Sequence, residues 1–129
     1  MRRGAARGNA MQLYDLHTHT NMSDASFPLE ELVEVEEAQG HILGVSDHIF
    51  CCGIYTLRDI ANYLELLKPY RVYRGVEANM EQRFDLPDEI DAQLDYVIAS
   101  VHSMPDGRGG FVPLSGYMAK RAGAVSFYE

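Results

Sequence analysis

The chain has 129 residues, of which 47% are hydrophobic and 23% charged, and it carries a formal net charge of −8. This length suits one globular domain but is short for a closed βα barrel, which usually has upwards of about 200 residues. The chain contains no apolar run of about 18 residues, the length needed to span a membrane. Three of the eleven basic residues lie in the first ten positions, so residues 11–129 contain eight basic and nineteen acidic residues. Such an acidic domain offers a poor surface for binding nucleic acid.

The first ten residues differ in composition from the rest of the chain. They are rich in arginine, glycine and alanine and show no periodicity, so we interpret residues 1–10 as a disordered tail or as a start assigned upstream of Met11. No apolar stretch follows them as it would in a signal peptide, so a cytoplasmic protein is expected. We expect a single domain to occupy residues 11–129.

Segments typical of strands and of helices alternate along that domain. Short segments with β-branched or aromatic residues predict strands at 12–16, 41–47, 71–77 and 94–101. Helical spacing of apolar residues predicts helices at 28–39 and 57–68, with Thr56 and Asp59 resembling a capping box for the second, and a shorter helix is expected at 87–93. This order indicates an α/β fold with parallel strands joined by right-handed crossovers.

A polar residue with metal-binding chemistry ends each predicted strand. These residues are His17, His48, Glu77 and His102. They are separated by 31, 29 and 25 residues, which is close to the roughly 30 residues of a βα unit. Because parallel strands bring their carboxyl ends to the edge of the sheet where active sites gather, we expect the four side chains to converge there.

The first of these strand ends offers two imidazoles. Because successive side chains of an extended chain alternate, Asp15, His17 and His19 are expected on one face, where the two histidines can hold one metal ion and Asp15 can orient an imidazole. Zinc, manganese and iron accept imidazole and carboxylate ligands together. The alternative for any single histidine is a structural role in the core or on the surface. That is our interpretation of His41, which precedes its strand at the opposite end.

In their contexts the strand ends resemble the motifs of the PHP family, which is named for polymerase and histidinol phosphatase. The matching segments are residues 15–20 (DLHTHT), 44–48 (GVSDH), 75–79 (GVEAN) and 99–103 (ASVHS). The resemblance covers about residues 11–112. It implies the N-terminal part of a distorted (βα)7 barrel with parallel strands, holding up to three divalent ions of zinc, manganese or iron and hydrolysing phosphate esters.

The resemblance also implies a role for each motif residue. His17 and His19 would bind one ion, and Glu77 would bridge it to a second. His102 would bind that second ion and His48 a third. His17, His19, Glu77 and His102 would thereby form the catalytic centre.

Two aspartates near these motifs have either an alternative role or a supporting one. Asp24 follows the first motif, where an acidic residue of the family faces the metal or its ligands, but it could instead cap the helix predicted from residue 28. Asp47, beside His48, is expected at best to support a ligand rather than to bind the ion itself.

Two arginines are candidates for binding the phosphate of a substrate. Arg83 lies in the loop predicted after Glu77, and Arg108 lies in the loop predicted after His102. Guanidinium groups in those loops would neutralise phosphate oxygens. The glycine-rich surroundings of Arg108 are equally what any tight turn would use.

The expected activity is hydrolysis of a small-molecule phosphate ester by a metal-activated hydroxide, with neither membrane nor nucleic acid as partner. The family's later motifs, a further His and an Asp-x-His, cannot be placed before Glu129, so we expect a truncated copy that binds metal weakly and catalyses poorly by itself. One alternative is a non-catalytic or inactive PHP module. Another is an amidohydrolase-type enzyme acting on C–N bonds, which also opens with His-x-His but generally uses a strand-end lysine where this chain has Glu77.

Overall fold

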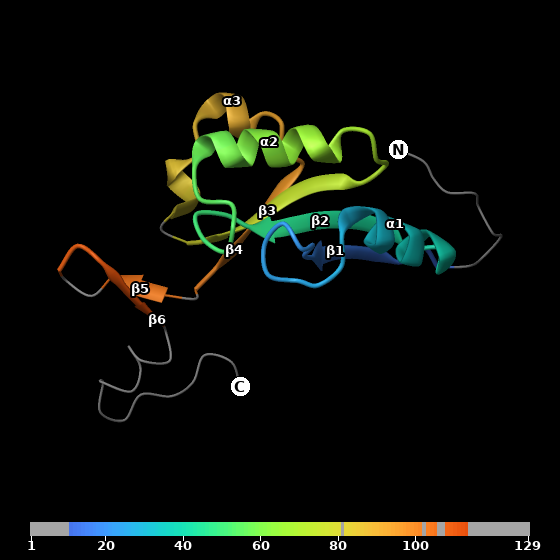
Figure 1. Cartoon of the computed structure of the whole chain (residues 1–129), viewed down its shortest axis with the longest axis horizontal. Helices are drawn as coiled ribbons and strands as arrows, with labels where there is room; N and C mark the ends of the chain where they lie inside the picture. The colour runs from blue at the N-terminus through green and yellow to red at the C-terminus, as the bar shows by residue number, and fades with distance from the viewer. Residues whose placement is uncertain (1–10, 81, 102, 106–107, 114–129) are drawn as a thin grey trace.

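The computed structural model describes residues 11–80, 82–101, 103–105 and 108–113 (Figure 1). The elements in chain order are β1 Tyr14–Thr18, α1 Leu29–Ala38, β2 Ile42–His48, α2 Leu57–Leu67, β3 Tyr73–Asn79, the 3-10 helix η1 Gln82–Asp85, α3 Asp88–Asp91, β4 Tyr96–Ser100, β5 Ser103–Pro105 and β6 Phe111–Pro113. The expected tail at residues 1–10 lies outside the described residues.

The first four strands form one sheet in the order β1-β2-β3-β4, and each neighbouring pair is parallel. Helices alternate with these strands along the chain, and the sheet curls into half of a barrel (Figure 1). This confirms the predicted α/β fold and its parallel strands. All four strands therefore end at the same edge of the sheet.

The hydrophobic core lies between one face of the sheet and the helices. It contains Leu29 of α1, Ile60 and Leu64 of α2, and Val45 and Val76 of the central strands. Figure 1 shows α2 running across the sheet on this side. Within the described residues, no helix has both the length and the apolar character needed to cross a membrane.

The opposite face of the sheet is the concave inside of the half barrel. Two glycines there leave room for the ring of Tyr96, because a Cβ at Gly75 would lie 2.4 Å from that ring and a Cβ at Gly44 would lie 2.5 Å from its hydroxyl oxygen. The Tyr96 hydroxyl donates a hydrogen bond of 2.5 Å to the carbonyl of Leu16. This link ties β4 to β1 across the inner face.

The capping box predicted at the start of α2 is present. The Thr56 hydroxyl accepts a hydrogen bond from the Asp59 backbone N–H, and the Asp59 carboxylate accepts one from the Thr56 N–H, each at 3.0 Å. Two backbone donors that the helix cannot satisfy are thereby paired.

Other local predictions were incomplete. The helix expected at 87–93 is a single turn, Asp88–Asp91, and η1 after β3 was not predicted, because such short 3-10 segments carry little sequence periodicity. The segment after β4 was expected to be a loop, but β5 and β6 pair there as an antiparallel hairpin. Its glycine-rich turn between short apolar segments is a hairpin signal that we interpreted as a loop.

Candidate metal centre

The register of the two central strands brings the second and third motifs together. His48 ends β2 and pairs directly with Glu77 in β3. Residues paired across neighbouring strands project to the same face, so both side chains point to the concave side of the sheet. The Glu77 carboxylate is nearly inaccessible, with 3% of its side chain exposed, and a buried carboxylate requires strong partners.

A register shift in β1 aims the first motif at the same point. Asp15 pairs with Leu43, but Thr18 pairs with Val45, so β1 has one more residue than β2 over this stretch. The extra residue is a β-bulge, which reverses the alternation of side chains along the strand. His17 therefore reaches the concave side together with His19, and both contact Glu77.

The bulge makes one geometric prediction wrong. Asp15 does not share a face with His17 and His19, because it pairs with Leu43, a buried residue of the core on the helix side. Its carboxylate lies instead near Glu36 and His41. The strict alternation that placed the three side chains together does not hold across an inserted residue.

Three imidazoles surround a single oxygen of Glu77. The Nε2 atoms of His17 and His19 lie 2.8 and 2.9 Å from Glu77 Oε1, and Nε2 of His48 lies 3.9 Å from the same atom. The rings of His19 and His48 pack edge to face with centroids 4.3 Å apart. The strand-end residues His17, His48 and Glu77 thus converge with His19, as the parallel topology predicted.

Asp24 joins this cluster from the loop that follows β1. Its Oδ1 lies 2.8 Å from Nδ1 of His19, and its Oδ2 lies 3.2 Å from Nε2 of His48. Although desolvation opposes the shift, the hydrogen bond with His19 and the charges of His48 and His19 lower the pKa of Asp24. The alternative role as a helix cap is wrong, because α1 has Pro28 at its N-cap and no side-chain cap bond.

Within the cluster, the surroundings of His19 give the strongest chemical indication of a cation site. Its two ring nitrogens each face a carboxylate, Nδ1 toward Asp24 and Nε2 toward Glu77. A neutral imidazole has one N–H and can donate to only one of them. If the Nδ1–H donates to Asp24, the Nε2 lone pair meets the negative Glu77 oxygen, and a cation between the two would satisfy both.

The loop that carries Asp24 is fastened by Asp47, which is fully buried. The Asp47 carboxylate accepts hydrogen bonds from the backbone N–H of Thr20 at 2.7 Å, from the Thr20 hydroxyl at 2.8 Å and from the Ser23 hydroxyl. The Tyr63 hydroxyl accepts from the Asp47 backbone N–H at 3.2 Å. Asp47 therefore supports the chain around Asp24, whereas the sequence predicted only that it would support a ligand and did not indicate its contacts with Thr20 and Ser23.

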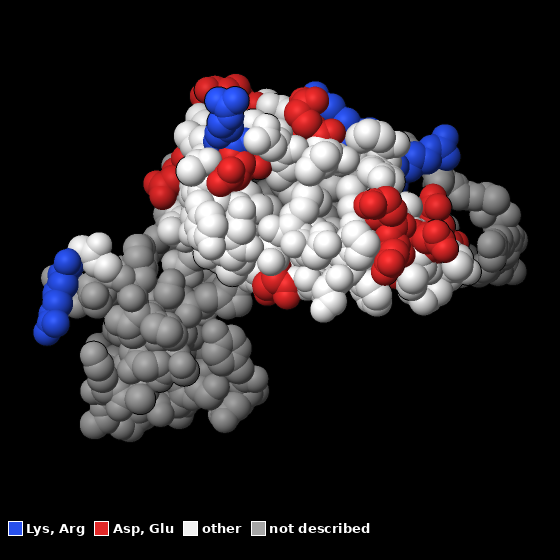
Figure 2. All heavy atoms as spheres, in the orientation of Figure 1, with Lys and Arg blue, Asp and Glu red and all other residues white. Residues whose placement is uncertain are grey.

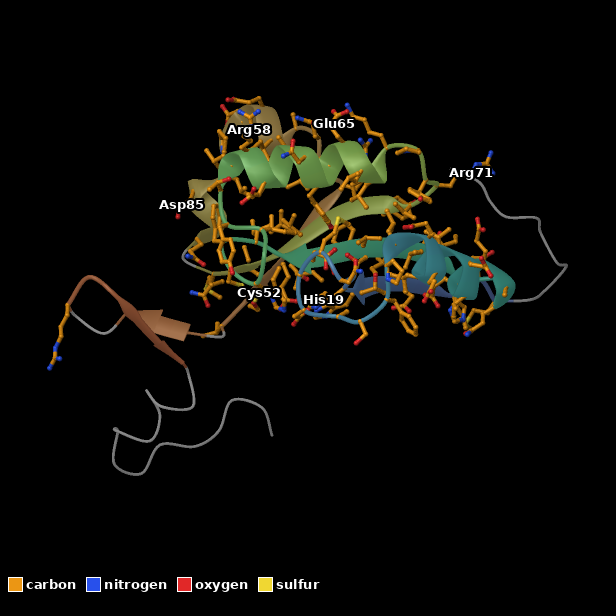
Figure 3. All side chains as sticks on the ribbon, in the orientation of Figure 1. His19, Cys52, Arg58, Glu65, Arg71 and Asp85 are labelled. Carbon is orange, nitrogen blue, oxygen red and sulfur yellow. The ribbon has the colours of Figure 1, made fainter. Side chains whose placement is uncertain are left out.

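A second loop, after β2, brings two thiols toward the same end of the sheet. Cys51 and Cys52 are free, and their sulfur atoms lie 2.8 Å apart. Burial, the contact with Cys52 and the charges of Asp24 and Glu77 raise the pKa of Cys51 to about 12, so its thiol stays protonated at neutral pH. Figure 3 labels His19 and Cys52 away from the end of the molecule that carries Arg71.

The remaining predicted site residues lie outside the described part of the chain or away from the cluster. His102 lies outside the described residues, as does the side chain of Arg83, which belongs to η1. Arg108 is exposed in the turn between β5 and β6, and Figure 1 shows that hairpin extending away from the sheet. The phosphate-binding roles of the two arginines stay predictions.

The donor set fits divalent transition metals. Two groups of three residues each offer ligand atoms within 4.8 Å of one another, His17 with His19 and Glu77, and His19 with Asp24 and His48. Ligand atoms of a tetrahedral zinc site, at bond lengths of about 2.0–2.2 Å, lie roughly 3.5 Å apart, so small movements would suffice. Imidazole and carboxylate together suit zinc, manganese or iron.

Comparison with known proteins gives the chain a family context. A family model described as PHP domain matches residues 15–124. A probable phosphatase of Clostridium acetobutylicum is 32% identical over 101 residues, which are 71% of this chain and 41% of that protein. A probable phosphatase of Caldanaerobacter subterraneus is 33% identical over 101 residues, covering 68% and 38%.

A further relative is a larger enzyme. The DNA polymerase/3'-5' exonuclease PolX of Bacillus subtilis is 28% identical over 102 residues, which are 69% of this chain and 18% of that protein. The comparison with solved structures gave no match. The chain thus spans about two fifths of the length of the probable phosphatases and less than one fifth of the polymerase.

Proposed function

The chain belongs to the PHP domain family, and from that premise we propose that the cluster around Glu77 is a divalent-metal centre for hydrolysis of a small-molecule phosphate ester. The observation that carries the proposal is the position of His19 between two carboxylates, with one ring nitrogen 2.8 Å from Asp24 and the other 2.9 Å from Glu77. That arrangement orients an imidazole toward a cation. The printed names of the phosphatase relatives support the reaction class.

Different side chains would bind the different ions of such a centre. His17 and His19 would supply neutral ring nitrogens to one ion, and Glu77 would supply the carboxylate oxygen that both already face. His48 and Asp24 would hold an adjacent ion, and His102 is the further ligand that the family resemblance implies. We propose zinc, manganese or iron as the metal, with up to three ions in a complete centre.

The residues around the ions would orient both the ligands and the substrate. The chemistry supplied by a divalent ion there would be a water of lowered pKa and neutralisation of phosphate oxygens. Asp24 would fix the tautomer of His19 by accepting its Nδ1–H, and Asp47 would hold the loop that carries Asp24. Arg83 and Arg108 remain candidates for the substrate phosphate.

A second candidate is a metal-binding module without turnover of its own. The match to the polymerase favours it, because the aligned segment is only 18% of that protein, the size of one module within a larger enzyme. Both candidates require the same cluster and differ only in whether hydrolysis follows binding. An amidohydrolase has no support from the comparisons.

One experiment separates these possibilities. Metal-free chain would be titrated with zinc or manganese by calorimetry, and release of nitrophenol from p-nitrophenyl phosphate would be followed in parallel. We expect weak metal binding at the Glu77 centre and slow metal-dependent hydrolysis. Both should be lost in Glu77→Gln and kept in Glu34→Gln, which alters an exposed glutamate of α1. Binding without hydrolysis would support the metal-binding module. Metal binding that is identical in wild type and Glu77→Gln would contradict both candidates.

A further inference from the structure

A second group of metal-ligating side chains lies on the helix side of the sheet. Asp15 of β1, Glu36 of α1 and His41 before β2 each offer one ligand atom, and these atoms all lie within 4.8 Å of one another. None of the three takes part in the cluster around Glu77. The sequence indicated only a structural role for His41.

The end of α1 folds His41 back onto Glu36. The backbone N–H of His41 donates to the carbonyl of Glu36 at 3.0 Å, that of Gly40 donates to the carbonyl of Glu37 at 3.0 Å, and Gly40 has a positive φ of 73°. These bonds form a Schellman motif, in which the two residues here occupied by Glu36 and His41 usually make a hydrophobic contact. In this chain the contact is polar instead, with His41 Nδ1 3.1 Å from Glu36 Oε2.

The interactions of the Glu36 carboxylate only partly offset the free-energy cost of burying it. Its side chain is 7% exposed, and its Oε1 is buried with no hydrogen-bond partner among the residues that the structure describes. Desolvation and the neighbouring Asp15 raise the pKa of Glu36 despite the opposing effect of His41. A buried carboxylate with an unpaired oxygen beside a second carboxylate is costly unless a proton or a metal cation joins the two groups.

We propose that Asp15, Glu36 and His41 form a second divalent-cation site, separate from the centre around Glu77. Two carboxylate oxygens and one imidazole nitrogen are a donor set for zinc or manganese, with water completing the coordination. The 3.1 Å between His41 Nδ1 and Glu36 Oε2 is already close to the roughly 3.5 Å between two ligands of one tetrahedral ion.

The surroundings suit a structural ion better than a catalytic one. The site joins β1 to the turn between α1 and β2, so a bound ion would clamp that turn to a strand distant in sequence. Figure 2 shows acidic side chains gathered over α1, where Glu30, Glu31, Glu34 and Glu37 are exposed. Their negative potential would draw cations toward this face. Asp15 and His41 are partly exposed, which leaves a path for entry.

The most direct test follows the histidine side chains of the wild-type chain by NMR during a zinc titration. We expect the His41 ring signals to shift at stoichiometric zinc in wild type and in Glu37→Gln, an exposed neighbour on α1, but not in Glu36→Gln. Circular dichroism would establish that each variant is folded. His41 signals that stay unmoved by several equivalents of zinc in the wild-type chain would overturn the proposal without any variant.

A calorimetric titration gives a second, independent readout. In a background with His17, His19 and His48 all changed to alanine, about one equivalent of zinc should still bind. Adding Glu36→Gln should weaken that binding by more than about tenfold, whereas adding Glu37→Gln should leave it unchanged. Equal binding in the Glu36→Gln and Glu37→Gln backgrounds would also overturn the proposal. Because the centre around Glu77 is disabled here, the outcome does not depend on the proposed phosphoesterase function.

Discussion

Two groups of histidine and carboxylate side chains lie on opposite faces of the same sheet and differ in how they are built. Around Glu77, separate strand ends and a loop bring three imidazoles toward one oxygen, and His17 remains 57% exposed. Around Glu36, a helix end closes one imidazole against a buried carboxylate. Residue type alone therefore does not fix the role of a histidine, because strand register and helix termination decide which partners it meets.

The bulge in β1 separates the two groups. Before the extra residue, Asp15 projects with Leu43 toward the helices, and after it His17 and His19 project toward Glu77. One inserted residue therefore divides a motif of closely spaced ligands between two faces. The two groups should therefore respond independently to substitution.

The largest effect is expected from Glu77→Gln. The variant removes the charge that His17 and His19 share, so metal affinity at this centre should fall by more than about a hundredfold, beyond the loss typical of outer-shell changes. Calorimetry with zinc would measure it. The zinc-induced shift of the His41 ring should persist, and its disappearance would mean that the two groups are not independent.

Among substitutions near the centre around Glu77 that leave the metal ligands unchanged, Asp47→Asn should be the most destabilising. Asn can accept fewer of the bonds from Thr20 and Ser23, and its amide would face donors, so the free energy of unfolding should fall by about 2–3 kcal/mol. Urea unfolding would measure the change. Zinc affinity at the Glu77 centre should weaken as the loop loosens, and an unaltered stability would show that the buried bonds are replaceable.

Tyr63→Phe should have a smaller effect, because it removes one buried hydroxyl that contacts the backbone of the two central strands. That hydroxyl lies 2.7 Å from the Gly75 carbonyl and accepts from the Asp47 N–H. We expect a loss of about 1–2 kcal/mol in unfolding free energy, measured in urea. Tyr55→Phe, at a residue 62% exposed, is the matched control and should change little. Equal effects of the two substitutions would contradict the role assigned to the buried hydroxyl.

Glu36→Gln should give the smallest effect, with a sign that depends on metal and pH. Because the folded state raises the pKa of Glu36, the stability linked to its protonation is complete below the ordinary value of 4.5 and is lost as pH rises through the folded pKa. In chelator at pH 7, with Asp15 and His41 facing it, the ionised group should make wild type less stable than the variant.

Thermal unfolding across pH would check this sign. The advantage of the variant should shrink as pH falls toward 4 and should reverse when zinc is added at pH 7, since only wild type would gain the bound ion. A variant that is less stable than wild type in chelator at pH 7 would contradict the account of an uncompensated carboxylate.

The sequence predicted the parallel strands because β-branched segments and amphipathic helices alternate at the length of a βα unit. It also predicted that His17, His48 and Glu77 converge, since parallel strands end at one edge, and the register of His48 with Glu77 bears this out. The position of Asp15 could not be predicted, because no residue in 14–18 signals a bulge. The contact between Glu36 and His41 depends on the turn at Gly40, which composition alone does not resolve.

The most direct test of the central claim is an anomalous diffraction measurement on crystals of the chain grown with zinc or manganese. The account predicts a metal peak within bonding distance of Glu77, shared with His17 and His19, with further density toward His48 and Asp24. Crystals that show metal elsewhere but none at the Glu77 carboxylate would contradict it.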